Sequence, residues 1–306
     1  MAQVALVCGA SGFIGRHAVE AFQAMGWDTF GGGRRSGASA VTGLLGAKYS
    51  EGDFRDRRFV EALLQRCRPD RIVFAAGPSD VQASFADPLE DFEAQTTPLF
   101  LLLDCARKQP NPPGVLLISS AAVYGNPVNL PVSETSETRP ISPYGFHKLC
   151  QERLLDQFAA LYGLPTCKAR LFSTLGSGLR RLAVWEITRR AMHGSFQLRG
   201  HGHESRDYLP VDDIGRAIAG LAEAAPFKGE VVNVGSGCET TIAELANEIY
   251  QALGIVHAPA FDGKLLAGSP IRWCADVSTL RSFGFAQKNP LAASIAETVN
   301  WIKLNA

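Results

Sequence analysis

The chain has no excess of charge of either sign, because its 30 Lys and Arg residues balance 30 Asp and Glu residues. Proteins that bind nucleic acid or an anionic membrane surface usually carry a basic excess, so neither partner is expected. Long hydrophobic runs are also absent, and the longest, residues 99–103, is far too short to cross a bilayer. Residues 1–9 lack the basic segment that opens a secretory signal.

Cysteine is sparse, with 7 residues scattered along the chain and no pair spaced as Cys-x-x-Cys. This pattern argues against a disulfide framework and a structural zinc site, so no metal is expected. Reduced thiols and the absence of a signal segment predict a cytoplasmic protein. Apolar residues make up 46% of the 306 residues, which is typical of a folded globular chain of about two domains.

Short apolar runs alternate with amphipathic stretches through the first half of the sequence. Strands are expected at residues 4–8, 71–76, 115–119 and 166–172, and helices at 15–25, 59–67, 87–108 and 144–162. This alternation predicts an α/β fold, a Rossmann-type doubly wound parallel sheet. The pattern loosens beyond residue 172. We therefore predict a first domain over residues 1–172 and a smaller C-terminal lobe, partly interleaved with it, over 173–306.

A glycine-rich turn stands between the first strand and the first helix. Glycines permit a tight turn and a close approach of backbone to a pyrophosphate, and the helix N-terminus adds free N–H groups. The first domain is therefore predicted to bind NAD(P), although such turns also occur for structural reasons alone. The residues predicted to contact the dinucleotide here are Gly9, Ser11, Gly12, Phe13, Ile14 and Gly15.

The second strand lacks the acidic residue that usually binds the adenosine ribose of NAD. Arg34, Arg35 and Ser36 stand there instead, and guanidinium groups suit a 2′-phosphate. We interpret this as a preference for NADP, with NAD less favoured; a solvated basic loop is the alternative. Further along, Asp53 is a candidate acceptor for the adenine amino group with Phe54 beside the ring, although Asp53 could instead cap the next helix.

Three residues form a candidate catalytic set. Ser120 ends a buried strand, where ligands bind in parallel sheets. Tyr144 and Lys148 are four residues apart and share one face of the predicted helix. A lysine ammonium and an oxidised nicotinamide would both lower the pKa of the tyrosine, so that it could act as a general base. Lys148 could also hold the nicotinamide ribose.

With these residues the chain resembles the extended short-chain dehydrogenase/reductases that act on nucleotide sugars. The resemblance covers nearly the whole chain and implies that Ala75 and Ala76, at the end of the strand predicted at 71–76, contact the cofactor. It also implies a nucleoside-diphosphate sugar substrate. Ser173, Arg206 and Arg272 would bind that substrate, the two arginines at its diphosphate. The further matching segments are residues 170–173, 206–213, 233–237 and 241–246.

The resemblance also implies a homodimer formed through the helices at residues 87–108 and 144–162. Leucines at 99–103, 149, 154 and 155 could supply the apolar contact, or could face the sheet.

Two departures from the family pattern narrow the chemistry. Ala121 and Ala122 stand where 4,6-dehydratases carry an acidic pair, so dehydration would need an unusual route. Ser173 and Gln95 replace asparagines that are frequent in the family. We therefore predict hydride transfer at C4 of a nucleoside-diphosphate hexose, with Tyr144 as acid and base, by an epimerase or a 4-ketoreductase. A non-catalytic NADP-binding regulator is disfavoured by the complete catalytic set.

Overall fold

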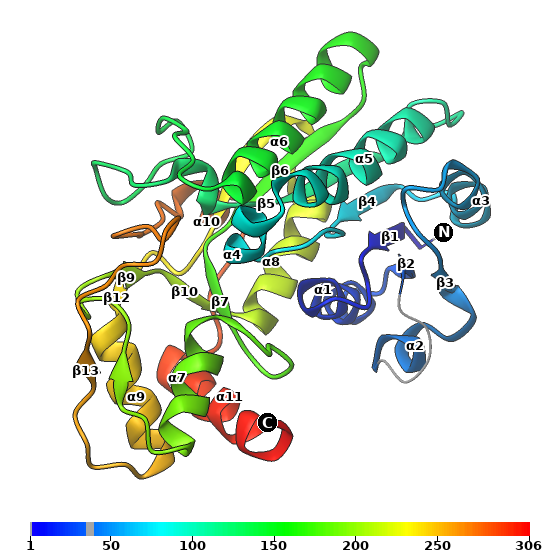
Figure 1. The fold of residues 1–306 in the computed structure, drawn as a ribbon. Coiled ribbons are helices and arrows are strands. Elements are labelled where there is room, and N and C mark those ends of the chain that lie inside the picture. Colours follow the sequence, from blue (N-terminus) through cyan, green and yellow to red (C-terminus); the bar gives the residue numbers. More distant parts are fainter. Residues whose placement is uncertain (1, 35–39) are drawn as a thin grey trace.

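The computed structural model describes residues 2–34 and 40–306 and is built around a seven-stranded parallel sheet (Figure 1). The strands follow the order β11-β6-β5-β4-β1-β2-β3. Because the strand order reverses between β1 and β4, the predicted Rossmann-type fold is confirmed. The strands are β1 (Val4–Cys8), β2 (Asp28–Gly33), β3 (Tyr49–Glu51), β4 (Arg71–Phe74), β5 (Gly114–Ser120), β6 (Thr166–Leu171) and β11 (Lys228–Val234).

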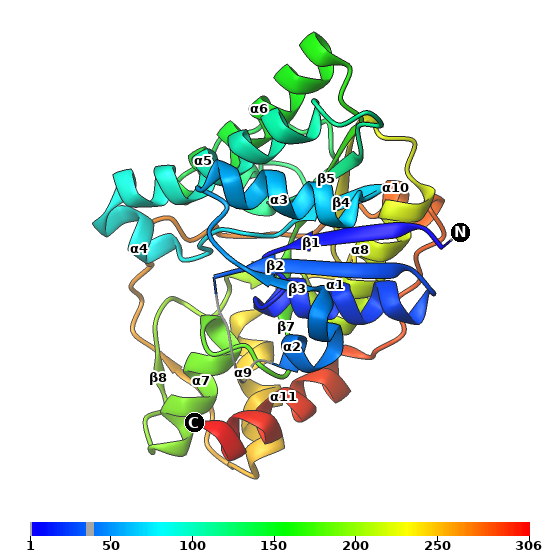
Figure 2. The same cartoon turned by 90° about the vertical axis from the view of Figure 1, so that its right-hand side faces the viewer.

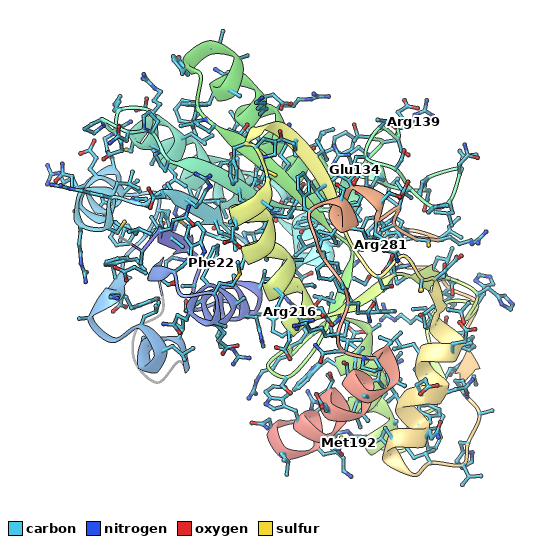
Figure 3. The ribbon with its side chains drawn as sticks, turned by 180° about the vertical axis from the view of Figure 1, so that it is seen from behind. Phe22, Glu134, Arg139, Met192, Arg216 and Arg281 are labelled. Atoms are coloured by element: carbon cyan, nitrogen blue, oxygen red, sulfur yellow. The ribbon has the colours of Figure 1, made fainter. Side chains whose placement is uncertain are left out.

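Apolar side chains cover both faces of this sheet. Along β1, Val7 packs into the core shared with α1 and α8, whereas Leu6 packs into the core shared with α3, α5 and α6. Figure 2 shows α3 and α5 on one side of β1 and α1 on the other, and Figure 3 places Phe22 on α1 near α8. The helices are α1 (Phe13–Ala24), α3 (Arg57–Cys67), α4 (Val81–Ala86), α5 (Pro88–Ala106), α6 (Pro143–Tyr162) and α8 (Val211–Ala224).

A smaller lobe has its own core between α7 (Leu182–Met192), α9 (Ile242–Leu253) and α11 (Leu291–Asn305). Ile187, Ile249 and Val299 are among its buried members. The chain beyond residue 172 also returns to the sheet, where β11 pairs with β6 and α8 packs on α1. The remaining elements are β7 (Ser173–Leu175), β8 (Gln197–Leu198), β9 (Ser205–Arg206), β10 (Tyr208–Pro210), β12 (Thr240–Thr241), β13 (Ala260–Phe261) and α10 (Ser278–Ser282).

Residues 31–34 and 40–46, which flank the glycine- and serine-rich segment, include regular elements. β2 continues through Gly33, and α2 (Ala40–Leu45) follows this segment. A Cβ on Gly31 would collide with the Ala10 and Leu45 side chains, so glycine serves close packing there. α5 continues as one helix through Pro98. Within residues 2–34 and 40–306, no helix is long and apolar enough for a transmembrane span.

Candidate functional site

The turn between β1 and α1 has the backbone shape that its glycines predict. Gly9 has φ of 84°, in the left-handed region, and its N–H donates to the Gly32 carbonyl at 2.8 Å. A Cβ on Gly9 would clash with the Ala75 backbone, and a Cβ on Gly15 would overlap the Gly9 carbonyl. Gly12 precedes α1 and provides no side-chain cap. Within the described part of the chain, no side chain caps the first-turn N–H groups of α1, and the glycines keep the backbone beside them free of Cβ atoms. This arrangement fits a dinucleotide pyrophosphate.

The end of β2 carries a positive charge rather than a carboxylate. Arg34 follows the strand and is exposed, whereas Arg35 and Ser36 lie outside the described residues. Asp53 accepts hydrogen bonds from Arg55, whose Nη2 lies 2.9 Å from Oδ2. These bonds lower the pKa of Asp53, and Arg34 adds a smaller effect of the same sign. Asp53 is thus a charged acceptor beside the predicted adenosine site.

Two expectations for the segment after β3 need correction. The side chain that caps α3 is Asp56, not Asp53. Phe54 is buried, and its ring packs edge-to-face against Phe59 and Phe74 at 5.4 and 6.4 Å between centroids. Because Phe54 is only 3% exposed, its ring offers little surface for stacking on an adenine.

The candidate catalytic residues meet where β5 ends and α6 begins. Ser142 caps α6, and its Oγ accepts from the Gly145 N–H at 3.1 Å. A Cβ on Gly145 would clash with the Ala122 carbonyl, so the first turn of α6 lies directly on the segment that follows β5. This packing places Tyr144 close enough to Ser120 for the serine hydroxyl to lower the tyrosine pKa, and both residues line one cavity. The structure therefore joins two residues that are 24 positions apart in sequence.

The pKa of Tyr144 is shifted in the direction opposite to our expectation. Burial raises the pKa of Tyr144 to about 12, and the Ser120 hydroxyl and the charge of Arg181 only partly oppose it. Lys148 Nζ lies over the Tyr144 ring, 5.9 Å from its centroid, and its hydrogen bonds go to the Ile118 carbonyl and Gln151. The same burial lowers the pKa of Lys148 to about 8.

A buried polar network supports the catalytic strand and helix, and the sequence reasoning did not foresee it. Glu152 accepts from Ser119 Oγ at 2.5 Å and from Arg170 at 3.0 and 2.7 Å. Arg170 also donates to the Tyr124 hydroxyl at 2.9 Å, and that hydroxyl donates to Asn233 at 2.7 Å. Burial alone would lower the pKa of Arg170, but the Glu152 carboxylate outweighs it and raises that pKa.

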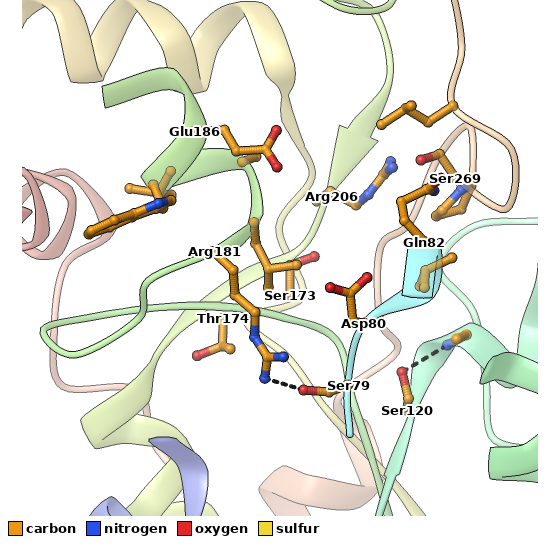
Figure 4. A pocket seen from close by; sticks show the side chains of 18 of the residues that line it. Ser79, Asp80, Gln82, Ser120, Ser173, Thr174, Arg181, Glu186, Arg206 and Ser269 are labelled. Atoms are coloured by element: carbon orange, nitrogen blue, oxygen red, sulfur yellow. Dashed lines mark hydrogen bonds between the residues drawn. The ribbon is translucent and has the colours of Figure 1, made fainter. Parts of the chain in front are cut away.

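A cavity of about 1180 Å³ opens between the carboxyl ends of the strands and the smaller lobe (Figure 4). Both parts of the chain contribute walls, so a ligand would contact the sheet and the lobe together. Of the predicted residues, Gly12, Phe13, Ile14, Gly15, Ala75, Ser120, Tyr144, Lys148, Ser173 and Arg206 line it, whereas Gly9, Ser11, Arg34, Asp53, Phe54, Ala76 and Arg272 do not.

The two predicted diphosphate arginines lie in different environments. Arg206 lies over the Trp273 ring at 5.6 Å and donates to the Ser205 carbonyl at 2.7 Å. No carboxylate within the described ranges pairs with Arg206, although burial lowers its pKa. Arg272 instead makes a two-point ion pair with Glu239 at 2.6 and 2.7 Å and is largely exposed. Of these two arginines, Arg206 alone therefore directs a free positive charge to the cavity.

Arg181 and Ser79 extend the site beyond the predicted residues. Arg181 precedes α7 in the lobe and donates to Ser79, which follows β4, so the pair bridges the two walls of the cavity (Figure 4). The position of Ser79 beyond the end of a parallel strand was a usable indication. In the sequence, Arg181 is visible only as part of a basic pair. Its contact with Ser79 could not be predicted, because the neighbouring residues do not indicate that its side chain reaches the sheet domain.

Comparison with known proteins agrees with this geometry. The model of the NAD dependent epimerase/dehydratase family matches residues 5–235. The chain belongs to this family. It is an enzyme of the extended short-chain dehydrogenase/reductase type, as the sequence predicts.

Its relatives in the family match over nearly their full length. A UDP-glucose 4-epimerase from Mycolicibacterium smegmatis is 28% identical, over 97% of this chain and 98% of the relative. The solved UDP-glucose 4-epimerase of Thermus thermophilus, in complex with NAD, has a TM-score of 0.89 and 26% identity over 99% of this chain and 100% of that one. The Thermotoga maritima UDP-glucose 4-epimerase with UDP-glucose has a TM-score of 0.87 and 25% identity over 99% of both chains.

Proposed function

We propose that this family member is a nucleotide-sugar 4-epimerase that exchanges hydride at C4 of a nucleoside-diphosphate hexose, with Tyr144 as acid and base. One observation carries the proposal: Ser120, Tyr144 and Lys148 line the same cavity as the glycine turn and Arg206. One cavity would thereby combine a dinucleotide site, a proton-transfer group and a charge for the diphosphate. The relatives named UDP-glucose 4-epimerase support UDP-hexose as the first substrate to test.

A nicotinamide dinucleotide fits the residues of the turn and would supply the hydride acceptor. The first-turn N–H groups of α1 would hold its pyrophosphate, and Asp53 would accept from its adenine. The NAD in the Thermus thermophilus structure favours NAD. Arg34, with no carboxylate at the end of β2, favours NADP. The cofactor that the purified protein binds more tightly decides between them.

The proposed proton transfer involves the Tyr144 hydroxyl and the C4 oxygen. Ser120 lines the cavity beside that hydroxyl and would hold the same oxygen. In the first half-reaction Tyr144 would accept the proton of the C4 hydroxyl as C4 loses hydride, and in the second it would return that proton to the C4 oxygen. Burial opposes the first step, because it raises the pKa of Tyr144 to about 12. Its action as a base requires positive charge nearby, and Arg181 supplies part of it by lowering this pKa.

Arg206 is the proposed partner of the substrate diphosphate. Its guanidinium has no carboxylate partner among the residues that the structure describes, and it lines the cavity. A diphosphate would supply the missing negative charge through charge-assisted hydrogen bonds. The exposed ion pair of Arg272 with Glu239 would have to break before Arg272 could do the same.

Two neighbouring activities share this machinery. A 4-ketoreductase would use each cofactor once, whereas an epimerase would keep its cofactor bound through both hydride transfers. Denaturing the purified protein and identifying the released nucleotide separates them, because a retained oxidised cofactor indicates the epimerase. A 4,6-dehydratase is not favoured, since Ala122 lines the cavity and Ala121 is buried, so neither position supplies an acid or a base.

The decisive assay is the interconversion of UDP-glucose and UDP-galactose. Tyr144→Phe removes the proton-transferring hydroxyl and is expected to lower kcat by about 10²–10⁴-fold. Tyr162→Phe changes an exposed tyrosine on the same helix and serves as the matched control. Equal turnover by the wild type and Tyr144→Phe would contradict the proposed role. No turnover of UDP-hexoses by the wild type would contradict uridine as the nucleoside, and no turnover of UDP-, dTDP-, GDP- or CDP-hexoses would contradict the substrate class.

We also propose that a second copy of the chain covers α5 and α6. The leucines at 99, 102, 103 and 155 are buried in the core of the sheet domain, so they do not supply the contact. Phenylalanines are exposed instead, and Phe100→Glu is expected to convert a dimer to monomers in sedimentation velocity. A monomeric wild type would contradict this proposal. The exposed apolar residues on these helices are Leu89, Phe92, Phe100, Phe146, Leu161 and Tyr162.

A further inference from the structure

The ammonium of Lys148 is enclosed on the protein side. Lys148 is 7% exposed, and its Nζ donates to the Ile118 carbonyl on β5 at 3.2 Å and to Gln151 Oε1 at 3.0 Å. An ammonium has three N–H donors. Two are used by these acceptors, and Lys148 also lines the cavity, so the third is available to a ligand.

Gln151 uses both ends of its side-chain amide. The residue is fully buried, and its Nε2 donates at 2.5 Å to the main-chain carbonyl of Gln95 on α5. A lysine ammonium only donates and a carbonyl only accepts, so one orientation of the amide satisfies both. The amide therefore connects Lys148 on α6 to the backbone of α5.

We propose that Gln151 is a positioning residue for Lys148, which holds the ammonium against β5 and directs its remaining N–H into the cavity. This inference rests on the proposed function, in which a protonated Lys148 supports catalysis. Nothing in the family resemblance assigns a role to this residue. Its effect would pass through Lys148 rather than through contact with substrate.

The charges around Lys148 make the neutral acceptor important. Burial lowers the pKa of Lys148, while Asp91 from α5 and Glu152 from α6 raise it. Both carboxylates are already engaged, because Asp91 lies 2.5 Å from His147 Nδ1 and Glu152 pairs with Arg170. The Tyr144 ring, also on α6, lies against the ammonium at 5.9 Å from the ring centroid. Among the residues that the structure describes, Gln151 is therefore the only side chain that accepts a hydrogen bond from Lys148.

Two substitutions should move the titration of Lys148 in opposite directions. Gln151→Met removes the acceptor at similar volume and should lower the pKa of Lys148 by about one unit, a tenfold change in its protonation equilibrium. Gln151→Glu adds a carboxylate and should raise it. Gln157→Met, at an exposed position of the same helix, should leave it unchanged. A purely structural role would lower activity without moving the titration in two directions.

Two measurements on the full-length protein test this. The first is the pH profile of kcat/KM, whose alkaline limb should shift down in Gln151→Met and up in Gln151→Glu. The second is NMR titration of ¹³C-labelled lysine, which requires no enzymatic turnover. The Lys148 signal is assigned by its loss in Lys148→Met. An unmoved Lys148 titration in both variants would overturn the inference. If the wild type showed no turnover, or if its turnover did not require Tyr144, the proposed function would be overturned. The NMR titration would still decide the role of Gln151.

Discussion

Replacement of Arg170 by methionine tests the buried network under the catalytic strand. The side chains of Arg170 and Glu152 are 7% and 3% exposed, and two hydrogen bonds of 3.0 and 2.7 Å join them. Arg170→Met would leave Glu152 buried with Ser119 as its remaining partner. Removal of one partner from a buried ion pair costs about 3–5 kcal/mol of unfolding free energy, because a charge is left uncompensated.

At about 2 °C per kcal/mol for a chain of this size, the melting temperature should fall by about 6–10 °C. Thermal unfolding followed by circular dichroism at a fixed scan rate would measure this change. The double variant Glu152→Gln/Arg170→Met, which removes both charges, should recover part of the loss. Activity should fall too, since Ser119 precedes Ser120 and Glu152 lies one helical turn beyond Lys148.

Arg153→Met provides the matched control on the same helix. Arg153 is 72% exposed and lies 3.3 Å from Asp156, and such surface pairs contribute about 0–1 kcal/mol. If Arg170→Met melted within about 1 °C of Arg153→Met, the buried pair would not carry the stability that we assign to it. If the double variant were less stable than Arg170→Met, the uncompensated charge would not be the cause.

Three further predictions concern other parts of the chain. Gly15→Ala should abolish dinucleotide binding in isothermal titration, because its Cβ would overlap the Gly9 carbonyl. Gly220→Ala on α8 is the control: its Cβ would meet nothing within 4 Å, so thermal melts should show a stabilisation of about 1 kcal/mol. Arg34→Ala should weaken NADP binding about tenfold and leave NAD binding unchanged, and an equal effect on both cofactors in fluorescence titrations would refute the assignment. Burial opposes ionisation of Asp104, but Lys108, Arg57 and Arg107 lower its pKa from 3.8 to about 2. The ionised Asp104 therefore stabilises the fold fully above about pH 4, and this contribution is lost as the pH falls towards about 2. Over that range the melting temperature of Asp104→Asn should fall less steeply than that of the wild type. Parallel curves of melting temperature against pH would contradict this sign.

The sheet domain could be predicted well because local patterns determine its elements. The glycine turn and the four-residue spacing of Tyr144 and Lys148 place their backbone and helix face without reference to distant residues. The α2 helix was missed, because glycine and serine around it mask the two apolar side chains, Val41 and Leu45, that anchor it in the core. Tertiary packing overrides local propensity in such segments.

The candidate site was harder to predict where it depends on long-range pairing. Arg272 was assigned to the diphosphate by resemblance, but its partner Glu239 is 33 residues away and no local pattern joins the two. Phe54 was placed beside adenine because it follows Asp53, although the surrounding core holds its ring. Likewise the pKa of Tyr144 depends on burial, which a helix pattern does not quantify.

The return of the chain to the sheet through α8 and β11 affects the order in which the protein can fold. A nascent chain that has emerged only as far as residue 172 would have β6 as an unpaired edge, and the sheet face that α8 covers would be bare. The sheet domain therefore cannot be finished during synthesis until residue 234 has emerged from the ribosome. In sequence, α7 of the smaller lobe lies between β6 and the α8–β11 segment that completes the sheet. The α7 segment must therefore form a loop between them while β11 pairs with β6, and we expect the sheet domain and the lobe to unfold together.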